Sequence, residues 1–134
     1  MNLFVDTSVW SLALRRDETS DQPIVRRLRD ALDGGDGVFT TGLVLQELLQ
    51  GFQGPKARDA IVDRFASLPL LIPDRTDHVK AAELRNGCRR SGIHVGTIDA
   101  LLAQLCVRHD LVMLSADQDF ILMAPHVGLT NWEP

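Results

Sequence analysis

Acidic residues directly follow two segments of this sequence that have the composition of buried β-strands. Asp6 follows residues 2–5 (NLFV), and Asp117 and Asp119 follow residues 111–116 (LVMLSA). In open parallel sheets, ligands bind outside the carboxyl ends of the strands. An acid at such a point either starts a turn or a helix or points into a binding site, and one residue alone does not decide between these.

Two further acids are expected within helices. Glu47 is the only charged residue of an otherwise apolar and amide-rich helix predicted over residues 43–52. Asp99 falls in the first turn of a helix predicted over residues 97–110, with Thr97 as its cap. A narrow exposed stripe would explain Glu47 structurally, and the positive end of the helix would explain Asp99.

The four positions become more informative when they are considered together. If Asp6, Glu47, Asp99 and Asp117 converge at one crevice, their carboxylates repel one another and raise each other's pKa. Such a cluster is hard to explain as a purely structural feature. It suits a divalent cation such as Mg²⁺, which prefers oxygen ligands, and metal-assisted hydrolysis of a phosphodiester is the chemistry that such a site supports.

Strand-like and helix-like segments alternate along the chain, which predicts a parallel sheet covered by helices on both faces. The first helix has Ser8 or Thr7 as its expected cap. The second starts near Asp21, has Pro23 in its first turn and ends at a Gly-Gly pair. The predicted strands are 2–6, 37–42, 69–73, 111–116 and 128–132, and the predicted helices are 7–16, 21–35, 43–52, 55–68, 76–92 and 97–110.

Length and composition are those of a soluble globular protein. The 134 residues predict a single domain, 1–134, and 45% of them are hydrophobic and 24% charged. We expect no signal peptide and no membrane span. Cys88 and Cys106 lack metal-binding spacing and are expected to be reduced thiols of a cytoplasmic protein. The four scattered histidines are expected not to be ligands, which leaves oxygen chemistry for any metal.

The charge balance is acidic, but its cations are unusual. The net charge is −4, which does not indicate a nucleic-acid binder on bulk electrostatics. Twelve of the fourteen cationic residues are arginine, and several are adjacent, as in Arg15-Arg16, Arg26-Arg27 and Arg89-Arg90. The planar guanidinium group suits phosphate, and a solvated helix face is the plainer interpretation.

Three stretches, FVDTSVW, LVLQELLQG and GTIDALLAQLCVRHDLVMLSADQDF, resemble the PIN domain, and in particular the VapC-type toxins of bacterial toxin–antitoxin pairs. The resemblance covers essentially the whole chain and implies a three-layer α/β/α fold with a central, mostly parallel sheet. It assigns the acidic quartet to Asp6, Glu47, Asp99 and Asp117, with Asp119 as an additional acid of the closing motif.

The same resemblance implies a function. It implies an endoribonuclease that depends on Mg²⁺ or Mn²⁺ and arrests translation, a homodimer, and neutralisation by a VapB-type antitoxin. The family's supporting hydroxyls correspond to Thr7 or Ser8 and to Ser115. Candidate RNA-binding cations are Arg85, Arg89 and Lys80, which belong to one predicted helix.

Two other classes of function stay open at this point. A phospho-receiver domain also groups acids around Mg²⁺, but it needs a lysine near the end of a late strand. The only lysines, Lys56 and Lys80, fall in predicted helices. A non-catalytic module that binds RNA or protein is the second alternative, and the intact acidic quartet argues against it.

Overall fold

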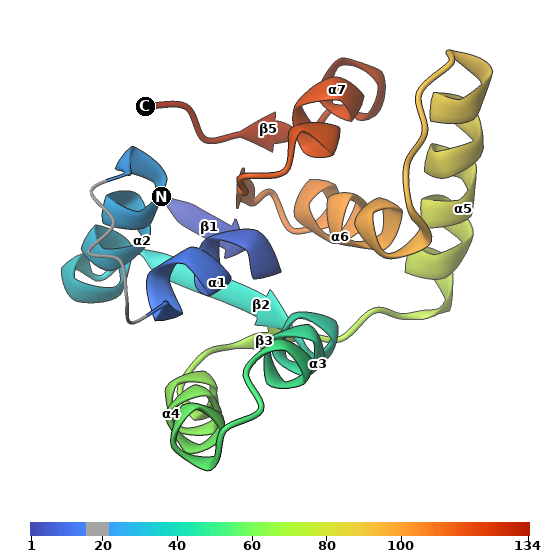
Figure 1. The fold of residues 1–134 in the computed structure, drawn as a ribbon. Coiled ribbons are helices and arrows are strands. Elements are labelled where there is room, and N and C mark those ends of the chain that lie inside the picture. The colour runs from blue at the N-terminus through green and yellow to red at the C-terminus, as the bar shows by residue number, and fades with distance from the viewer. Residues whose placement is uncertain (16–21) are drawn as a thin grey trace.

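A computed structural model describes residues 1–15 and 22–134 of the chain. In this part of the chain, five parallel strands form one sheet in the order β3-β2-β1-β4-β5 (Figure 1). The strands are β1 (Asn2–Val5), β2 (Gly37–Thr41), β3 (Leu70–Leu71), β4 (Val112–Leu114) and β5 (Thr130–Asn131). The helices are α1 (Thr7–Leu14), α2 (Pro23–Gly34), α3 (Gly42–Gly51), α4 (Pro55–Ala66), α5 (Arg75–Arg90), α6 (Thr97–Arg108) and α7 (Gln118–Val127). Arg16 and Asp21, used in the predictions above, lie outside the described residues.

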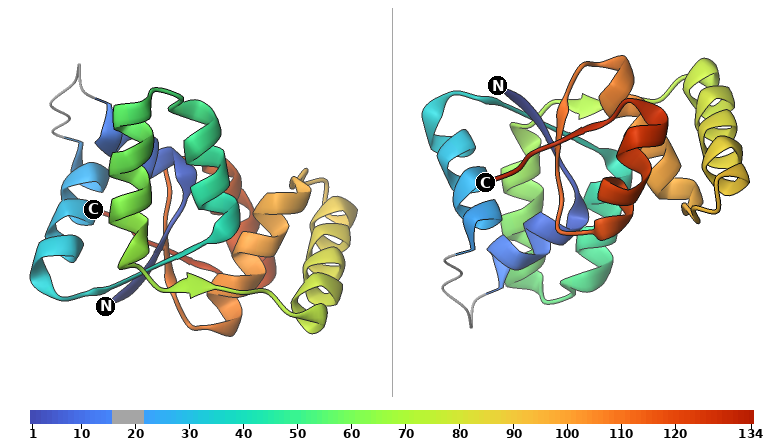
Figure 2. Two further views of the ribbon diagram at one scale, coloured as in Figure 1. Left: turned by 90° about the horizontal axis from the view of Figure 1, so that it is seen from below. Right: turned by 90° about the horizontal axis from the view of Figure 1, so that it is seen from above.

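The helices form two groups that cover the sheet. Helix α1 packs on α2 and α3, and α3 packs on α4, while α5 and α7 both contact α6. The two groups lie on opposite sides of the strands (Figures 1 and 2). The predicted three-layer α/β/α arrangement is therefore confirmed, and the sheet is parallel at all four of its strand pairs.

The central strand, β1, brings the ends of two strands together. Leu3, Phe4 and Val5 are fully buried because this strand is covered on both faces. Val5 pairs with Leu114 of β4, and the next backbone N–H, that of Asp6, donates to the Leu114 carbonyl oxygen at 3.2 Å. The residues that follow β1 and β4 are consequently neighbours.

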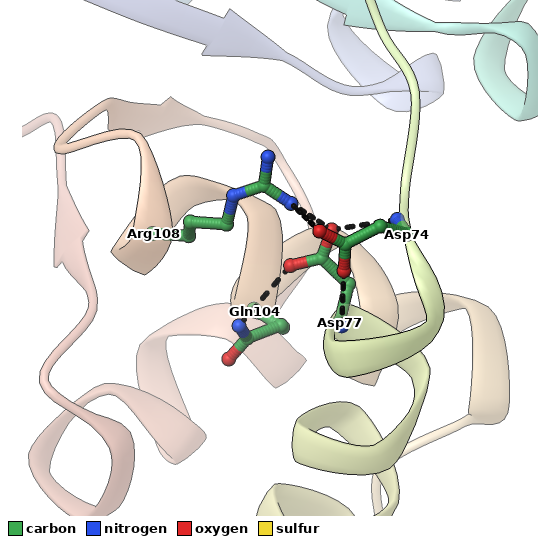
Figure 3. Close-up of polar contacts among 4 residues, drawn as sticks. All are labelled: Asp74, Asp77, Gln104 and Arg108. Carbon is green, nitrogen blue, oxygen red and sulfur yellow. Dashed lines mark hydrogen bonds and ion pairs between the residues drawn. The ribbon is translucent and has the colours of Figure 1, made fainter.

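Helix α5 lies at the outer edge of the molecule and is fastened to α6 by a polar cluster (Figure 3). The fully buried Asp77 carboxylate accepts hydrogen bonds from the Asp74 N–H at 2.9 Å and from Gln104 Nε2 at 3.4 Å, and it forms an ion pair with Arg108. Burial alone would raise the pKa of Asp77, but these hydrogen bonds and the guanidinium charge outweigh it and lower that pKa.

Helix α7 was missed by the sequence prediction, which placed no helix over residues 118–127. Two features make α7 hard to predict from sequence. Pro125 lies in its last turn, and no charged residue after Asp119 marks an exposed helix face. The signal was nevertheless present, because Phe120, Met123, Ala124 and Val127 have helical spacing and are all buried or half-buried.

The predicted caps of two helices were wrong by one residue. The cap of α1 is Asp6 itself, whose side chain accepts from the Ser8 N–H. The cap of α6 is Gly96, and Thr97 already has helical backbone and provides no side-chain cap. Both errors have the same cause. In each case a hydroxyl residue follows another residue that can also cap a helix, and the sequence does not show which of the two is the cap.

None of the helices in the described ranges has the length and apolar character needed to cross a membrane.

Candidate metal centre

Asp6 is buried at the carboxyl end of β1, with 6% of its surface exposed. Its Oδ1 accepts from the Ser8 N–H at 3.1 Å and from Ser8 Oγ at 2.5 Å, and its Oδ2 accepts from Ser115 Oγ at 2.6 Å. Burial raises the pKa of Asp6, and the hydrogen bonds from Ser115, Ser8 and the backbone oppose that rise.

The two serines connect Asp6 to the loop that follows β4. Ser8 Oγ accepts from the Ala116 N–H at 2.9 Å, and Ser115 Oγ accepts from the Asp117 N–H at 2.9 Å. Because each oxygen accepts a backbone N–H, each hydroxyl is oriented to donate its proton to Asp6. The sequence left open whether Thr7 or Ser8 supports the site, and in the structure Ser8 holds Asp6.

Three acids, Asp99, Asp117 and Asp119, lie close together in the described part of the chain. Carboxylate oxygens of Asp99, Asp117 and Asp119 all lie within 4.8 Å of one another, and the three side chains are half-buried. Asp99 is in the first turn of α6. Asp117 caps α7 and accepts from the Asp119 N–H at 2.9 Å, so the cap geometry fixes both acids of the closing motif.

All five acids contribute to the electrostatics at Asp99. Burial and the negative charges of Asp117, Asp6, Asp119 and Glu47, in that order, raise the pKa of Asp99 to about 6. Each of the other three residues of the predicted quartet, and Asp119, is therefore close enough to Asp99 to repel its negative charge. Glu47 lies at the exposed rim of the cluster.

Glu47 accepts a hydrogen bond from Thr7, which the sequence analysis gave as the alternative to Ser8 for supporting the site. Thr7 Oγ1 donates to Glu47 Oε1 at 3.1 Å, which connects the start of α1 to α3. Adjacent hydroxyls thus support different acids, since Thr7 holds Glu47 and Ser8 holds Asp6.

Cys106 was not predicted as a neighbour of the site. It is buried, and burial together with the charge of Asp6 raises the pKa of its thiol. Cys106 lies two helical turns after Asp99 on the same face of α6, so helical spacing could have placed it behind the carboxylates.

The three candidate RNA-binding cations are all on α5, outside the carboxylate cluster. Arg85 is half-buried, and its Nε donates to the Val95 carbonyl oxygen at 2.8 Å. Arg89 and Lys80 are exposed.

The donor set determines what this cluster can bind. Every candidate ligand is a carboxylate oxygen, and the mutual repulsion that raises the pKa of Asp99 would be relieved by a bound cation. Oxygen-only sites of this kind suit Mg²⁺ and Mn²⁺, so the residues fit a hard divalent ion.

The sequence model of the PIN domain family matches residues 3–124. A search of curated protein sequences gives no match to this chain.

Several solved structures share the fold over nearly the whole chain. VapBC2 from Rickettsia felis, bound to a DNA fragment from its promoter, is 18% identical with a TM-score of 0.75, and the match covers 99% of this chain and 100% of that one. FitAcB from Neisseria gonorrhoeae is 19% identical with a TM-score of 0.74, covering 98% and 97%. VapC20 from Mycobacterium tuberculosis, a toxin that cleaves the sarcin–ricin loop, is 22% identical with a TM-score of 0.70, covering 99% and 100%.

Proposed function

Because this chain belongs to the PIN domain family, we propose that it is a metal-dependent endoribonuclease and the toxin of a type II toxin–antitoxin pair. The observation that carries the proposal is the convergence of acidic residues around Asp99, which together with burial raises the pKa of that residue to about 6. The structures with the same fold, VapBC2 and VapC20 among them, are toxins or toxin–antitoxin complexes by name and support the toxin role.

We assign the metal to Asp99, Asp117 and Asp119, with Asp6 and Glu47 completing the acidic set. Bound Mg²⁺ or Mn²⁺ would activate a water molecule and offset the negative charge that develops on the scissile phosphate. The protein's part is to hold the carboxylates ionised and in place. The positive end of α6 favours the ionised form of Asp99, and the serine hydroxyls on Asp6 fix the direction of that carboxylate.

The catalytic residues in this proposal are Asp6, Glu47, Asp99 and Asp117, and the supporting residues are Thr7, Ser8 and Ser115. RNA away from the cut would contact Arg85, Arg89 and Lys80 on α5. These cations offset the acidic net charge of the chain where the substrate approaches, since a bound metal and nearby arginines determine the local field.

Partners and location complete the proposal. A VapB-type antitoxin would neutralise the protein, which we expect to be a homodimer in the cytoplasm. Cys88 and Cys106 are both buried free thiols, as expected in a reducing compartment. The phospho-receiver alternative loses its support, because Lys56 and Lys80 lie within α4 and α5 rather than at a strand end.

Cleavage of labelled RNA by the purified protein tests the activity. We expect cleavage with Mg²⁺ or Mn²⁺, none in EDTA, and a loss of at least about 100-fold for Asp99→Asn, because a neutral amide is a poor ligand for a hard cation. Asp110→Asn, at an exposed acid after α6, is the matched control and should cut like the parent. Undiminished cutting in EDTA by protein free of contaminating nuclease would overturn the proposal, and binding of RNA without cutting would favour the non-catalytic module.

The toxin role has its own test in cells. Expression without a partner should arrest growth, and Asp99→Asn should relieve the arrest at equal protein level. If Asp99→Asn is as toxic as the parent, then Asp99 serves only as a charge at the start of α6.

A further inference from the structure

A groove of about 320 Å³ runs between α5 and α6. Its apolar lining comes mainly from small residues, Ala81 and Ala82 of α5 and Ala100 of α6, together with Leu101. Because these side chains are small, they leave the space between the two helices unfilled. The volume lies at the lower end of the range of about 300–1,000 Å³ for ligand pockets.

The polar residues of the groove can donate and accept hydrogen bonds at its edges. Arg85, Asn86, His78 and Thr97 supply a guanidinium, an amide, an imidazole and a hydroxyl. The Arg85 Nε donates to the Val95 carbonyl oxygen, which fixes the side chain and leaves its terminal nitrogens as further donors. The apolar floor can bury the face of a nucleobase, and the polar groups at the edges can form hydrogen bonds with the base edge.

The α5 side of the groove is also cationic. Helical spacing places Arg89 one turn beyond Arg85, on the face of α5 that lines the groove. Lys80 falls on a different face of α5. Helix α5 carries five cationic residues against two acidic ones, and the buried acid, Asp77, is already paired with Arg108. In a chain of net charge −4, α5 is therefore a cationic element, and Arg85 and Arg89 place two of its charges on the groove side, where a polyanion can bind.

The groove and the carboxylate cluster share the first turn of α6. Thr97 and Ile98 line the groove, and the next residue, Asp99, belongs to the cluster. Gly96 begins this turn, and a Cβ at this position would lie 3.9 Å from Asp99 Oδ2. The two sites are thus on opposite flanks of one helix, about 10–12 Å across, a span that a short single-stranded segment can cross.

We propose that the α5–α6 groove binds an unpaired base of the RNA substrate near the cut, with Arg89 holding a neighbouring phosphate. This subsite rests on the proposed ribonuclease function and names the form of RNA that it accepts, a single-stranded loop or end rather than a continuous duplex. Burial of the base against the apolar floor supplies the affinity, and Arg85 and Asn86 contact the base edge.

The test blocks the groove and measures RNA affinity without cleavage. Ala82→Trp fills the groove from an exposed position of α5, and Ala60→Trp makes the same change on an exposed position of α4. With single-stranded RNA in EDTA, we expect Ala82→Trp to weaken binding at least about 10-fold, because the base loses the apolar surface that buries it. Ala60→Trp should bind RNA like the parent, and all variants should bind Mn²⁺ equally.

A second pair of variants, Arg89→Gln and Arg64→Gln, separates the contribution of charge to RNA binding from that of apolar contact. It also tests the subsite if Ala82→Trp misfolds. Arg89→Gln should weaken binding about 3- to 10-fold, and the effect should shrink as salt rises because it reflects a phosphate contact. Arg64→Gln, on exposed α4, should have no effect. The effect of Ala82→Trp should persist at high salt.

Three outcomes would overturn the subsite. The first is equal RNA affinity of Ala82→Trp and Ala60→Trp together with an unchanged affinity of Arg89→Gln. The second is a loss of self-association or of antitoxin binding by Ala82→Trp at unchanged RNA affinity, which assigns the groove to a protein. The third is a parent that neither binds nor cuts RNA, which removes the proposed function as well. A parent that binds RNA through the groove but does not cut it contradicts only the proposed activity.

Discussion

The electrostatic effect of the acidic cluster is clearest in the pKa of Asp99. Its pKa of about 6, against an ordinary value of 3.8, means that the folded protein binds this proton more tightly than the unfolded chain does. The free energy of unfolding of the metal-free protein therefore falls, through this group, as pH rises from about 4 to about 6. A metal ion must displace the same proton.

Metal affinity should consequently depend on pH through Asp99. Below pH 6 we expect the apparent affinity for Mn²⁺ to fall about 10-fold per pH unit, since binding then releases one proton. Isothermal titration between pH 5 and pH 7 measures this slope. The Asp99→Asn protein should bind Mn²⁺ weakly and lose that slope, and a parent affinity that is constant from pH 5 to pH 7 would contradict the role given to Asp99.

Asp6 combines a structural and an electrostatic role, because it caps α1 and also carries a buried charge. Asn caps helices as well as Asp does, so Asp6→Asn keeps the cap and removes the charge. In EDTA its unfolding free energy should stay within about 1 kcal/mol of the parent, because lost repulsion offsets a weakened serine hydrogen bond. Its stabilisation by millimolar Mg²⁺ should vanish.

Asp6→Ala is the matched comparison, since it removes the cap and both hydroxyl contacts. It should lose about 2 kcal/mol in EDTA. Thermal melts of the three proteins with and without Mg²⁺ separate the roles. An Asp6→Asn protein that gains as much stability from Mg²⁺ as the parent would exclude Asp6 from the metal site.

At the scale of elements, the attachment of the edge helix α5 depends on one buried carboxylate. Asp77 fastens α5 to α6 through Gln104, Arg108 and the backbone of Asp74 (Figure 3). Since its pKa is lowered in the folded state, this interaction stabilises the protein at neutral pH. The stabilisation is lost as pH falls from the ordinary value of 3.8 through the lower folded pKa.

Asp77→Asn should therefore destabilise the protein by about 2–3 kcal/mol at pH 7, because it weakens charge-assisted hydrogen bonds at a buried site. The difference from the parent should shrink in acid. Asp59→Asn, which breaks the exposed Arg58–Asp59 pair, should change stability by less than about 0.5 kcal/mol. Equal urea midpoints for Asp77→Asn and Asp59→Asn would show that the cluster does not hold α5.

The elements were mostly predictable from sequence, and their ends were predictable where proline or glycine marks them. Proline and glycine fixed the bounds of α2, with Pro23 in its first turn and Gly35 in the left-handed conformation after its end. The predicted cap at Thr97 failed because Gly96 and Thr97 are both acceptable at that position. Helix α7 was missed because Pro125 is an exception tolerated within its last turn.

The candidate site was predictable in membership but not in geometry. Strand-end positions indicated Asp6 and Asp117 directly, and their proximity follows from the register of Val5 against Leu114. The tight approach of Asp119 to Asp99 depends on the α7 cap, which no local pattern specified. The contacts of Ser115 with Asp6 and of Ala116 with Ser8 likewise join residues 109 and 108 positions apart in the chain.

At the scale of the whole molecule, the sign of the charge changes across the surface. The chain has a net charge of −4, yet α5 carries an excess of arginine and lysine beside a groove that opens next to the carboxylates. The cations of α5 attract a polyanion and the carboxylates repel it, so bound metal should strengthen RNA binding without being required for it.

The central claim is that the converging carboxylates form a divalent metal centre, and anomalous diffraction from crystals grown with Mn²⁺ tests it most directly. The predicted result is a manganese peak about 2.0–2.3 Å from oxygens of Asp99 and of Asp117 or Asp119, absent from Asp99→Asn crystals grown in the same way. Saturating Mn²⁺ without a peak at this cluster, or with the peak unchanged in Asp99→Asn, would contradict the account.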